Sequence, residues 1–163
     1  MKVVSNSSPL VNLSRIGRLS ILKHLYGTIF IPGAVFYEVA TKGSGMPGSS
    51  DVASADWIVV RRIIDETQLC ILNYDLDPGE SESIVLSIQE AADLLIMDER
   101  MGREKARHLG LVYTGTVGVL VEAKAKGLID QVLPVIEELR LKAGFRLSES
   151  LVDHVGKSVG EDR

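Results

Sequence analysis

The chain has 163 residues and a net charge of −4, and its length fits one domain that buries about two-thirds of the surface its unfolded form would expose. The net charge gives no support for a nucleic-acid binder held by bulk positive charge, although a bound metal ion could bring its own charge to a phosphate backbone. Because there is no amino-terminal apolar signal region and no apolar run of the ~20 residues that a membrane span requires, we expect a cytoplasmic protein with no membrane partner.

The amino-terminal part of the chain predicts two strands and three helices. Ser8 and Pro9 are suited to the N-cap and first position of a helix that follows a short buried strand. Apolar residues then keep a helical period until the second strand, which Pro32 closes. The expected elements are a strand over Lys2–Ser5, two short helices from Pro9 onward that break near Gly17, a strand over Thr28–Ile31 and a helix over Gly33–Thr41.

The next part of the chain carries weaker signals. Residues Lys42–Ser54 are rich in Gly, Ser and Pro, and we expect them to form a loop inside the domain. Trp57–Val60 and Leu69–Leu72 are short apolar runs that we predict as strands. Cys70, the single cysteine, lies in the second run and is expected to be a small core residue, in keeping with a reducing compartment.

A capped helix that leads into a buried strand is the best-defined part of the sequence. Asp77 and Glu80 have the spacing of an N-cap and a capping-box glutamate, and with the intervening proline they predict a helix over Pro78–Ala91. The run Asp93–Met97 is apolar from its second residue on, as is typical of a central parallel strand covered on both faces. The strand stops at Asp98, so this carboxylate should emerge at the sheet edge where open α/β sheets bind ligands.

The remaining segments complete an alternation of strands and helices. They are a strand over Leu111–Tyr113 and helices over Val117–Lys126, Gln131–Lys142 and Glu149–Val155. This alternation favours an α/β fold with a central parallel sheet of about five strands and helices on both faces. We expect one domain over residues 1–157, with residues 158–163 forming a frayed tail.

Four oxygen-bearing side chains are candidates for a shared site. Asn6 and Asp98 follow two different strands at the same sheet edge, whereas Glu38 borders the buried face of its own helix. Taken singly, Asn6 is interpreted as a turn or cap residue, Glu80 as a capping-box residue and Glu38 as a solvated acid. Carboxylates gathered without lysine or arginine repel one another unless they share a cation, and oxygen ligands suit Mg²⁺ or Mn²⁺.

Histidines and arginines give less specific signals. His24, His108 and His154 lack the spacing of zinc ligands, so zinc chemistry is not expected. Arg100 and Arg103 closely follow Asp98, and two interpretations apply to them. They form either a solvated helix face or substrate-binding contacts to a phosphate.

Five stretches carry a family pattern that extends from Val3 to about Arg146. They are VVSNSSPLVNL, IPGAVFYEV, LDPGESESIVLS, LLIMDERMGREKA and YTGTVGVLVEAKAKGLI. In these stretches the chain resembles PIN-domain proteins, specifically the VapC-like branch. The resemblance implies a small α/β domain whose clustered acids bind Mg²⁺ or Mn²⁺. The activity that it implies is that of an endoribonuclease, often the toxin of a toxin–antitoxin pair.

The resemblance also implies which residues form the site. Glu38, Glu80 and Asp98 match the catalytic, metal-binding acids of the family, and Glu82 is an alternative to Glu80 that fits the spacing less well. The first acid of the pattern falls on Asn6, whose amide oxygen can ligate a metal but brings no charge. The metal ligands implied for this chain are therefore Asn6, Glu38, Glu80 and Asp98.

Two functions are consistent with this pattern. The first is a metal-dependent endoribonuclease in which metal-activated water attacks an RNA phosphodiester. The second is a catalytically weakened PIN fold that serves as a binding or regulatory module, because Asn6 brings no charge. The resemblance further implies a homodimer that binds a small antitoxin protein. A phospho-acceptor signalling domain is disfavoured, because such a domain would need acids where Asn6 follows the first strand.

Overall fold

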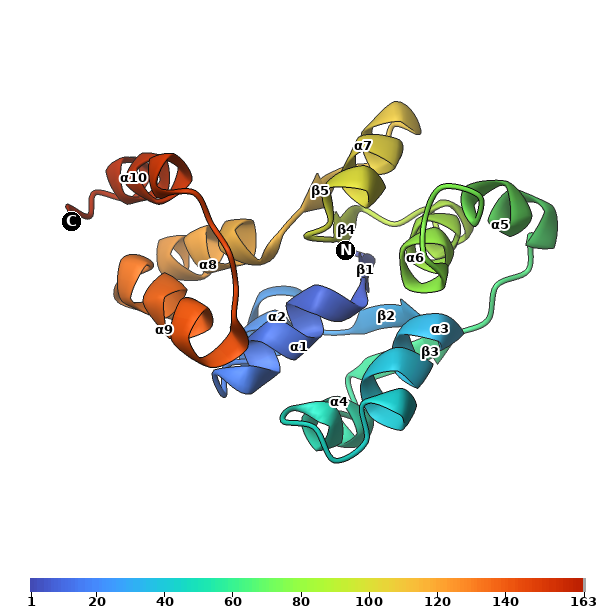
Figure 1. Ribbon diagram of the computed structural model, residues 1–163, viewed down its shortest axis with the longest axis horizontal. Coiled ribbons are helices and arrows are strands. Elements are labelled where there is room, and N and C mark those ends of the chain that lie inside the picture. The colour runs from blue at the N-terminus through green and yellow to red at the C-terminus, as the bar shows by residue number, and fades with distance from the viewer. Residues whose placement is uncertain (163) are drawn as a thin grey trace.

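In the computed structural model, which describes residues 1–162, five strands form one parallel sheet in the order β3-β2-β1-β4-β5 (Figure 1). The strands are β1 (Val3–Ser5), β2 (Ile29–Pro32), β3 (Ile58–Arg61), β4 (Leu94–Ile96) and β5 (Tyr113–Thr114). Every pair of neighbours is parallel. The predicted α/β fold with a parallel sheet of about five strands is therefore confirmed.

Helices cover both faces of this sheet. They are α1 (Ser7–Arg15), α2 (Ser20–Tyr26), α3 (Gly33–Phe36), the π-helical turn η1 (Tyr37–Lys42), α4 (Ser49–Ser54), α5 (Glu66–Leu72), α6 (Pro78–Gln89), α7 (Arg100–His108), α8 (Thr116–Ala125), α9 (Leu133–Ala143) and α10 (Glu149–Ser158). Figure 1 shows α1, α2, α8 and α9 to the left of the sheet and α5 and α6 to the right. No helix in residues 1–162 is long and apolar enough to cross a membrane.

The alternation of side chains along the strands divides the core into two clusters. Val3 and Ile96 belong to the cluster under α1, α2, α8 and α9, whereas Val4 and Leu95 belong to the cluster under α6 and α7. All four side chains are almost completely buried. Successive residues of a strand point to opposite faces, so a central strand that is covered on both sides must be apolar at every position.

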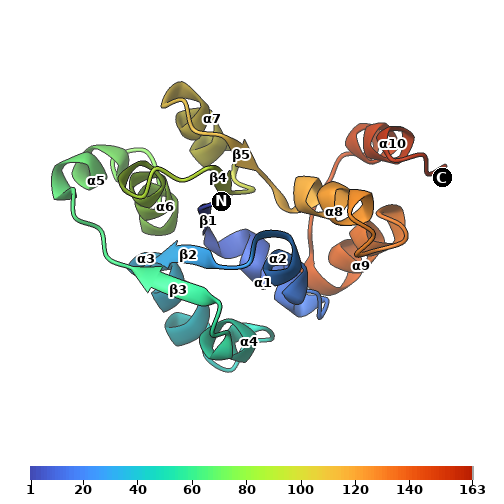
Figure 2. The ribbon, with the colours of Figure 1, turned by 180° about the vertical axis from the view of Figure 1, so that it is seen from behind.

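The order in which the chain adds strands to the sheet reverses between β1 and β4. From β1 the connections lead to β2 and β3 on one side, and from β4 they lead to β5 on the other (Figure 2). Backbone connections therefore diverge at the carboxyl ends of β1 and β4. Such a switch point is where doubly wound sheets bind their ligands, and both Asn6 and Asp98 lie there.

Three predictions about the middle of the chain are wrong. Leu69–Leu72 is part of helix α5, because Asp65 caps this helix by accepting a 2.9 Å hydrogen bond from the Gln68 amide. Cys70 lies on the solvent side of α5 and is exposed, so it is not a core residue. The expected loop Lys42–Ser54 also contains helix α4, in which Val52 is buried against the core.

The start of α1 also differs from the prediction. Asn6, not Ser8, occupies the N-cap position, with an extended backbone at φ −80° and ψ 176°. The backbone N–H of Asn6 donates a 2.9 Å hydrogen bond to the backbone carbonyl of Ile96. Because this bond continues the ladder between β1 and β4, the chain stays extended up to Asn6 and turns into the helix directly afterwards.

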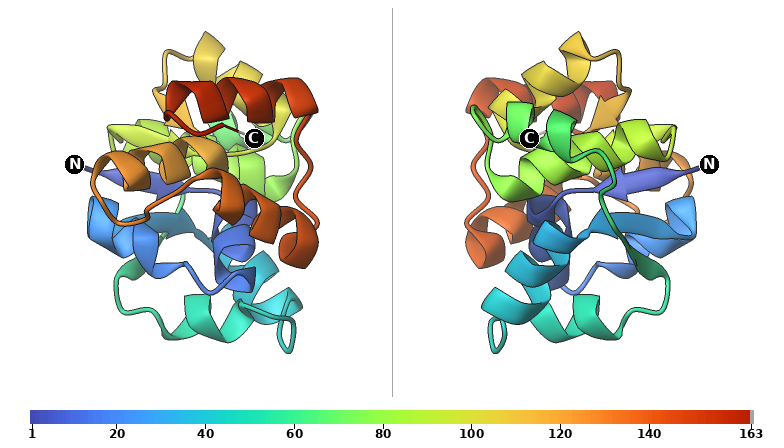
Figure 3. Two further views of the ribbon diagram at one scale, coloured as in Figure 1. Left: turned by 90° about the vertical axis from the view of Figure 1, so that its left-hand side faces the viewer. Right: turned by 90° about the vertical axis from the view of Figure 1, so that its right-hand side faces the viewer.

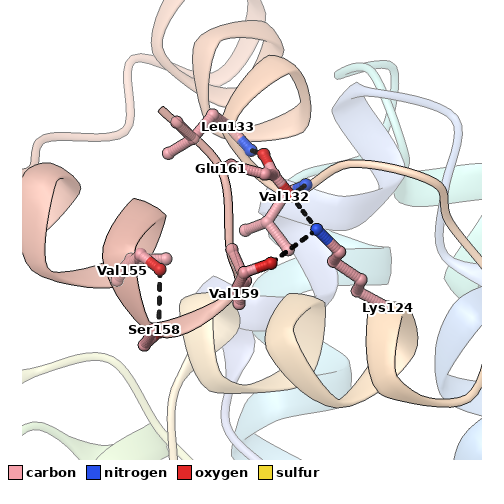
Figure 4. A network of polar contacts seen from close by, with 7 residues as sticks. All are labelled: Lys124, Val132, Leu133, Val155, Ser158, Val159 and Glu161. Atoms are coloured by element: carbon pink, nitrogen blue, oxygen red, sulfur yellow. Dashed lines mark hydrogen bonds and ion pairs between the residues drawn. The ribbon is translucent and has the colours of Figure 1, made fainter. Parts of the chain in front are cut away.

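The expectation of a frayed tail from residue 158 does not describe residues 158–162. The Glu161 carboxylate accepts hydrogen bonds from the amides of Val132 and Leu133, at 2.7 and 2.8 Å, and from Lys124 Nζ at 2.7 Å (Figure 4). Glu161 therefore caps the first turn of α9 from a distant part of the chain. Figure 3 shows the chain passing from α9 to α10 along the outside of the molecule before it returns to this contact.

Candidate active site

Asn6 is buried at the point where β1 ends. The residue is 3% exposed, and its Nδ2 donates a 2.9 Å hydrogen bond to Glu99 Oε2. Within residues 1–162, its Oδ1 has no hydrogen-bond partner. A buried amide oxygen without a donor is costly to maintain, so this oxygen is suited to receive a ligand.

Glu38 brings a carboxylate to the same place from the π-helical turn η1. Its Oε2 accepts a 2.7 Å hydrogen bond from Ser7 Oγ in the first turn of α1. A Cβ atom added to Gly79 would lie 3.1 Å from this Oε2, 3.2 Å from Asn6 Oδ1 and 3.4 Å from Asp77 Oδ1. The missing side chain of Gly79 therefore leaves a space lined by three oxygen atoms, which we call the Gly79 space.

Glu80 lies beside this space in the predicted capping box. Its amide donates to Asp77 Oδ1 at 2.8 Å, and its own Oε2 accepts from the Asp77 amide at 3.1 Å. Burial raises the pKa of the Glu80 carboxyl above its ordinary value, whereas the hydrogen bond from the Asp77 backbone amide lowers it. The negative charges of Asp77, Glu99 and Glu38 raise the pKa further. Glu80 is thus both a cap and a member of the acidic group.

Asp98 emerges after β4, as predicted, and is held by the first residue of α8. Thr116 donates to it twice, from its amide to Oδ1 at 2.7 Å and from Oγ1 to Oδ2 at 2.6 Å. Burial raises the pKa of the Asp98 carboxyl, and this effect exceeds the opposing effect of the two hydrogen bonds. Gly115 has to be small, since a Cβ atom there would lie 2.7 Å from Asp98 Oδ1.

Glu99 is a further acid of this edge and was missed by the sequence-based prediction. It is the N-cap residue of α7, and its two carboxylate oxygens accept hydrogen bonds from Asn6 Nδ2 and Ser8 Oγ. Its negative charge raises the pKa of both Glu80 and Asp98. The sequence indicated only that Glu99 directly follows Asp98 at the end of a predicted strand. The contact between Glu99 and Asn6 is a consequence of the fold.

The two predicted substrate-binding arginines have different surroundings. Arg103 lies 5.3 Å above the ring of Tyr113 and close to Asp98, whose pKa its charge lowers. The exposed Arg100 points along α7 to Glu104, with a 3.0 Å ion pair. Arg103, but not Arg100, lines a cleft of about 690 Å³ beside Asp98. The cleft is also bordered by Phe145 and Arg146 from the segment between α9 and α10.

The alternative acid Glu82 is engaged elsewhere. Its Oε2 accepts a 2.8 Å hydrogen bond from the Ala34 amide at the start of α3. Glu80 is therefore the acid of α6 that lies with Glu38 and Asn6. As the side chains stand in residues 1–162, no three acidic, histidine or cysteine groups converge closely enough to hold a metal ion.

The donor chemistry of this edge nevertheless fits a hard divalent cation. The unpartnered Asn6 oxygen and the Glu38 carboxylate face one small space, and both are oxygen ligands. The pKa values of Glu80 and Asp98 are raised, which is expected where carboxyls are buried near other acids without enough positive charge. Since Glu80, Asp98 and Glu99 all accept bonds from protein donors, binding an ion would require some of these side chains to turn.

The fold and this edge define an α/β domain with clustered acids at the switch point of a parallel sheet. A family model described as PIN domain matches residues 2–161, so the chain belongs to the PIN domain family. PIN domains are a nuclease fold and generally use divalent metal ions.

A solved structure agrees with this fold. The chain is similar to a PilT N-terminus domain protein from the hyperthermophilic archaeon Sulfolobus solfataricus P2, with 19% sequence identity and a TM-score of 0.54. The match covers 76% of this chain and 93% of the archaeal one. No curated protein matches the sequence.

Proposed function

We propose that this protein is a metal-dependent endoribonuclease of the VapC-like toxin type, with Glu38, Glu80, Asp98 and Asn6 as ligands of Mg²⁺ or Mn²⁺. One observation carries this proposal. The buried, unpartnered oxygen of Asn6 and the carboxylate of Glu38 face the same space beside Glu80, at the sheet edge where Asp98 emerges. A bound ion would supply a water nucleophile of lowered pKa and stabilise charge on the phosphate.

The protein's own residues hold and orient the reacting groups. Ser7 orients Glu38, the capping box orients Glu80 and Thr116 orients Asp98 through two bonds. Each carboxylate has lone pairs beyond those its donors occupy, so a carboxylate that turns toward an ion can keep one of these bonds. Such contacts to the ligating carboxylates typically contribute strongly to metal affinity.

The cleft beside Asp98 is suited to the RNA strand. Arg103 and Arg146 line it, and within residues 1–162 neither side chain forms an ion pair with an acid. Arginine binds phosphate through a planar fork of donors, and Phe145 in the same cleft offers an aromatic face to a base. The cleft therefore supplies phosphate and base contacts next to the acids.

Metal-dependent thermal stability and RNA cleavage together test this function. Millimolar Mn²⁺ should raise the melting temperature, because a ligand that binds only the folded state stabilises it, and the protein should then cleave a mixed RNA panel to 5′-phosphate ends. Asp98→Asn keeps the shape of the side chain and should abolish both effects. Asp51→Asn is the matched control, since Asp51 is an exposed acid in α4. A melting curve that Mn²⁺ leaves unchanged at neutral pH would contradict the metal site.

A catalytically weakened binding module is the second candidate, and Asn6 is the observation that favours it. Asn6 places a neutral amide where the family pattern has an acid, and its Nδ2 is already occupied by Glu99. Under this alternative the protein binds RNA or a protein partner without cleaving RNA in Mg²⁺ or Mn²⁺. Binding of the RNA panel with no metal-dependent cleavage would support the module over the nuclease.

The partners rest on the family resemblance. We propose a homodimer that binds a small antitoxin protein, a segment of which covers the acidic edge. Light scattering of the purified protein tests the homodimer. A pull-down with proteins co-expressed from neighbouring genes tests the antitoxin partner. Monomer alone in light scattering, with no bound small protein, would contradict them.

A further inference from the structure

Asn6 is oriented by a single acid. Its Nδ2 donates to Glu99 Oε2 at 2.9 Å, and its opposite atom, Oδ1, lies 3.2 Å from the position a Cβ of Gly79 would take. The amide therefore bridges Glu99 and the Gly79 space. Because the Nδ2 group donates to Glu99, the oxygen of Asn6 is directed toward Glu38 and the Gly79 space.

Glu99 itself is held at the sheet edge. Ser8 Oγ donates to its second oxygen, so both donors come from the N-terminal end of α1. These donors are neutral, and within residues 1–162 no lysine or arginine forms an ion pair with Glu99. The Glu99 side chain is partly buried, and its two hydrogen bonds fix it beside Asn6 and Ser8 at the carboxyl end of β1.

We propose that Glu99 supplies the negative charge that Asn6 lacks, from the far end of the Asn6 amide that it orients toward the ion. The inference rests on the metal site of the proposed function. Together with Glu38, Glu80 and Asp98, Glu99 gives four carboxylates around one neutral amide, besides the capping residue Asp77. Charge complementarity with a divalent cation is thereby restored without an acid at position 6.

Calorimetric Mn²⁺ titration of four proteins tests this inference: the wild type, Glu99→Gln, Asn6→Asp and the double variant. Gln keeps the length of Glu99 and an oxygen that can accept from Asn6. Glu99→Gln should weaken Mn²⁺ binding about tenfold or more, and Asn6→Asp should strengthen it. The double variant has the carboxylate count of the wild type and should regain close to wild-type affinity.

The outcomes separate this inference from the proposed function. No Mn²⁺ binding by the wild type would overturn the proposed function and this inference with it. Binding by the wild type and equal binding by Glu99→Gln would overturn this inference alone. A weakened Glu99→Gln that Asn6→Asp does not rescue would also overturn it, because Glu99 would then act by position and not by charge.

A metal-free measurement gives an independent readout. In the presence of EDTA, Asn6→Asp sets a carboxylate against Glu99 and should lower the melting temperature, because two unshared acids repel each other. The same substitution in the Glu99→Gln background should lower it less. Equal decreases in both backgrounds would mean that positions 6 and 99 are not coupled through charge, which contradicts the inference.

Discussion

Single side chains decide whether the Gly79 space exists. Gly79 is in the first turn of α6, where it has ordinary helical surroundings and no left-handed backbone that would require glycine. What distinguishes it is the absence of a Cβ atom, since one would lie 3.1 Å from Glu38 Oε2 and 3.2 Å from Asn6 Oδ1. We interpret this glycine as the residue that keeps the space open for a ligand.

Gly79→Ala should separate ligand binding from stability. The free energy of unfolding should stay within about 1 kcal/mol of the wild type, because alanine favours the helix by about that amount and the tight contacts oppose it. Mn²⁺ affinity should fall about tenfold or more, since the methyl group occupies the space between Asn6 and Glu38. Urea unfolding and calorimetric titration measure the two quantities.

Gly33→Ala is the matched control for this substitution. Gly33 begins α3, and a Cβ atom there would have no neighbour within 4 Å. This variant should keep wild-type Mn²⁺ affinity. If Gly79→Ala also kept it, the Gly79 space would not be the ligand site.

At the scale of elements, the carboxyl-terminal segment is tied to α9 through one acid. Burial alone would raise the pKa of Glu161, but Lys124 and the amides of Val132 and Leu133 outweigh this effect and lower the pKa. The segment between α9 and α10 borders the cleft beside Asp98. The contact in Figure 4 therefore stabilises the two helices that carry one wall of that cleft.

Glu161→Gln should lower the free energy of unfolding by about 2 kcal/mol at neutral pH, because charge-assisted hydrogen bonds contribute roughly that much. A folded-state pKa below the ordinary value means that this stabilisation is present above the pKa of the unfolded chain. It is lost as the pH falls through the folded-state pKa. The difference between wild type and variant should therefore shrink in acid.

Urea unfolding from neutral to acidic pH measures this difference. Asp162→Asn is the control, because the neighbouring Asp162 is exposed and should contribute little at any pH. A Glu161→Gln variant as stable as the wild type at neutral pH would show that the tail contact does not stabilise α9.

At the scale of the whole molecule, the acids at the sheet edge act against stability in the absence of a cation. Burial and neighbouring charges raise the pKa values of Glu80 and Asp98, so these acids bind protons more tightly in the folded protein than in the unfolded chain. Their contribution is most favourable below the ordinary carboxyl pKa of about 4. It declines as the pH rises through the raised folded-state values.

Metal-free Asp98→Asn should show this dependence. Asparagine is neutral at every pH, so the variant should gain stability relative to the wild type as the pH rises from about 4 to neutrality. Added Mn²⁺ should reverse the order, because only the wild type keeps the proposed carboxylate ligand. Urea unfolding in EDTA and in Mn²⁺ at several pH values measures both effects. A pH-independent difference in EDTA would contradict the raised pKa of Asp98.

The sequence by itself determined the elements whose signals are local. The capping box of Asp77 and Glu80 and the buried runs of β1 and β4 depend on neighbouring residues, and the structure confirms them. The prediction of a strand over Leu69–Leu72 was wrong, because an apolar run this short fits a strand or a helix equally well. The N-cap at Asp65 favours the helix.

Only the tertiary structure decided what surrounds each acid. Asn6 meets Glu99, 93 residues away, because β1 and β4 are neighbours in the sheet, and no local pattern encodes that pairing. The same holds for Glu161, whose partners belong to α8 and to the start of α9. Sequence patterns specify which residues form a helix or strand, whereas contacts between distant residues follow from how those elements pack.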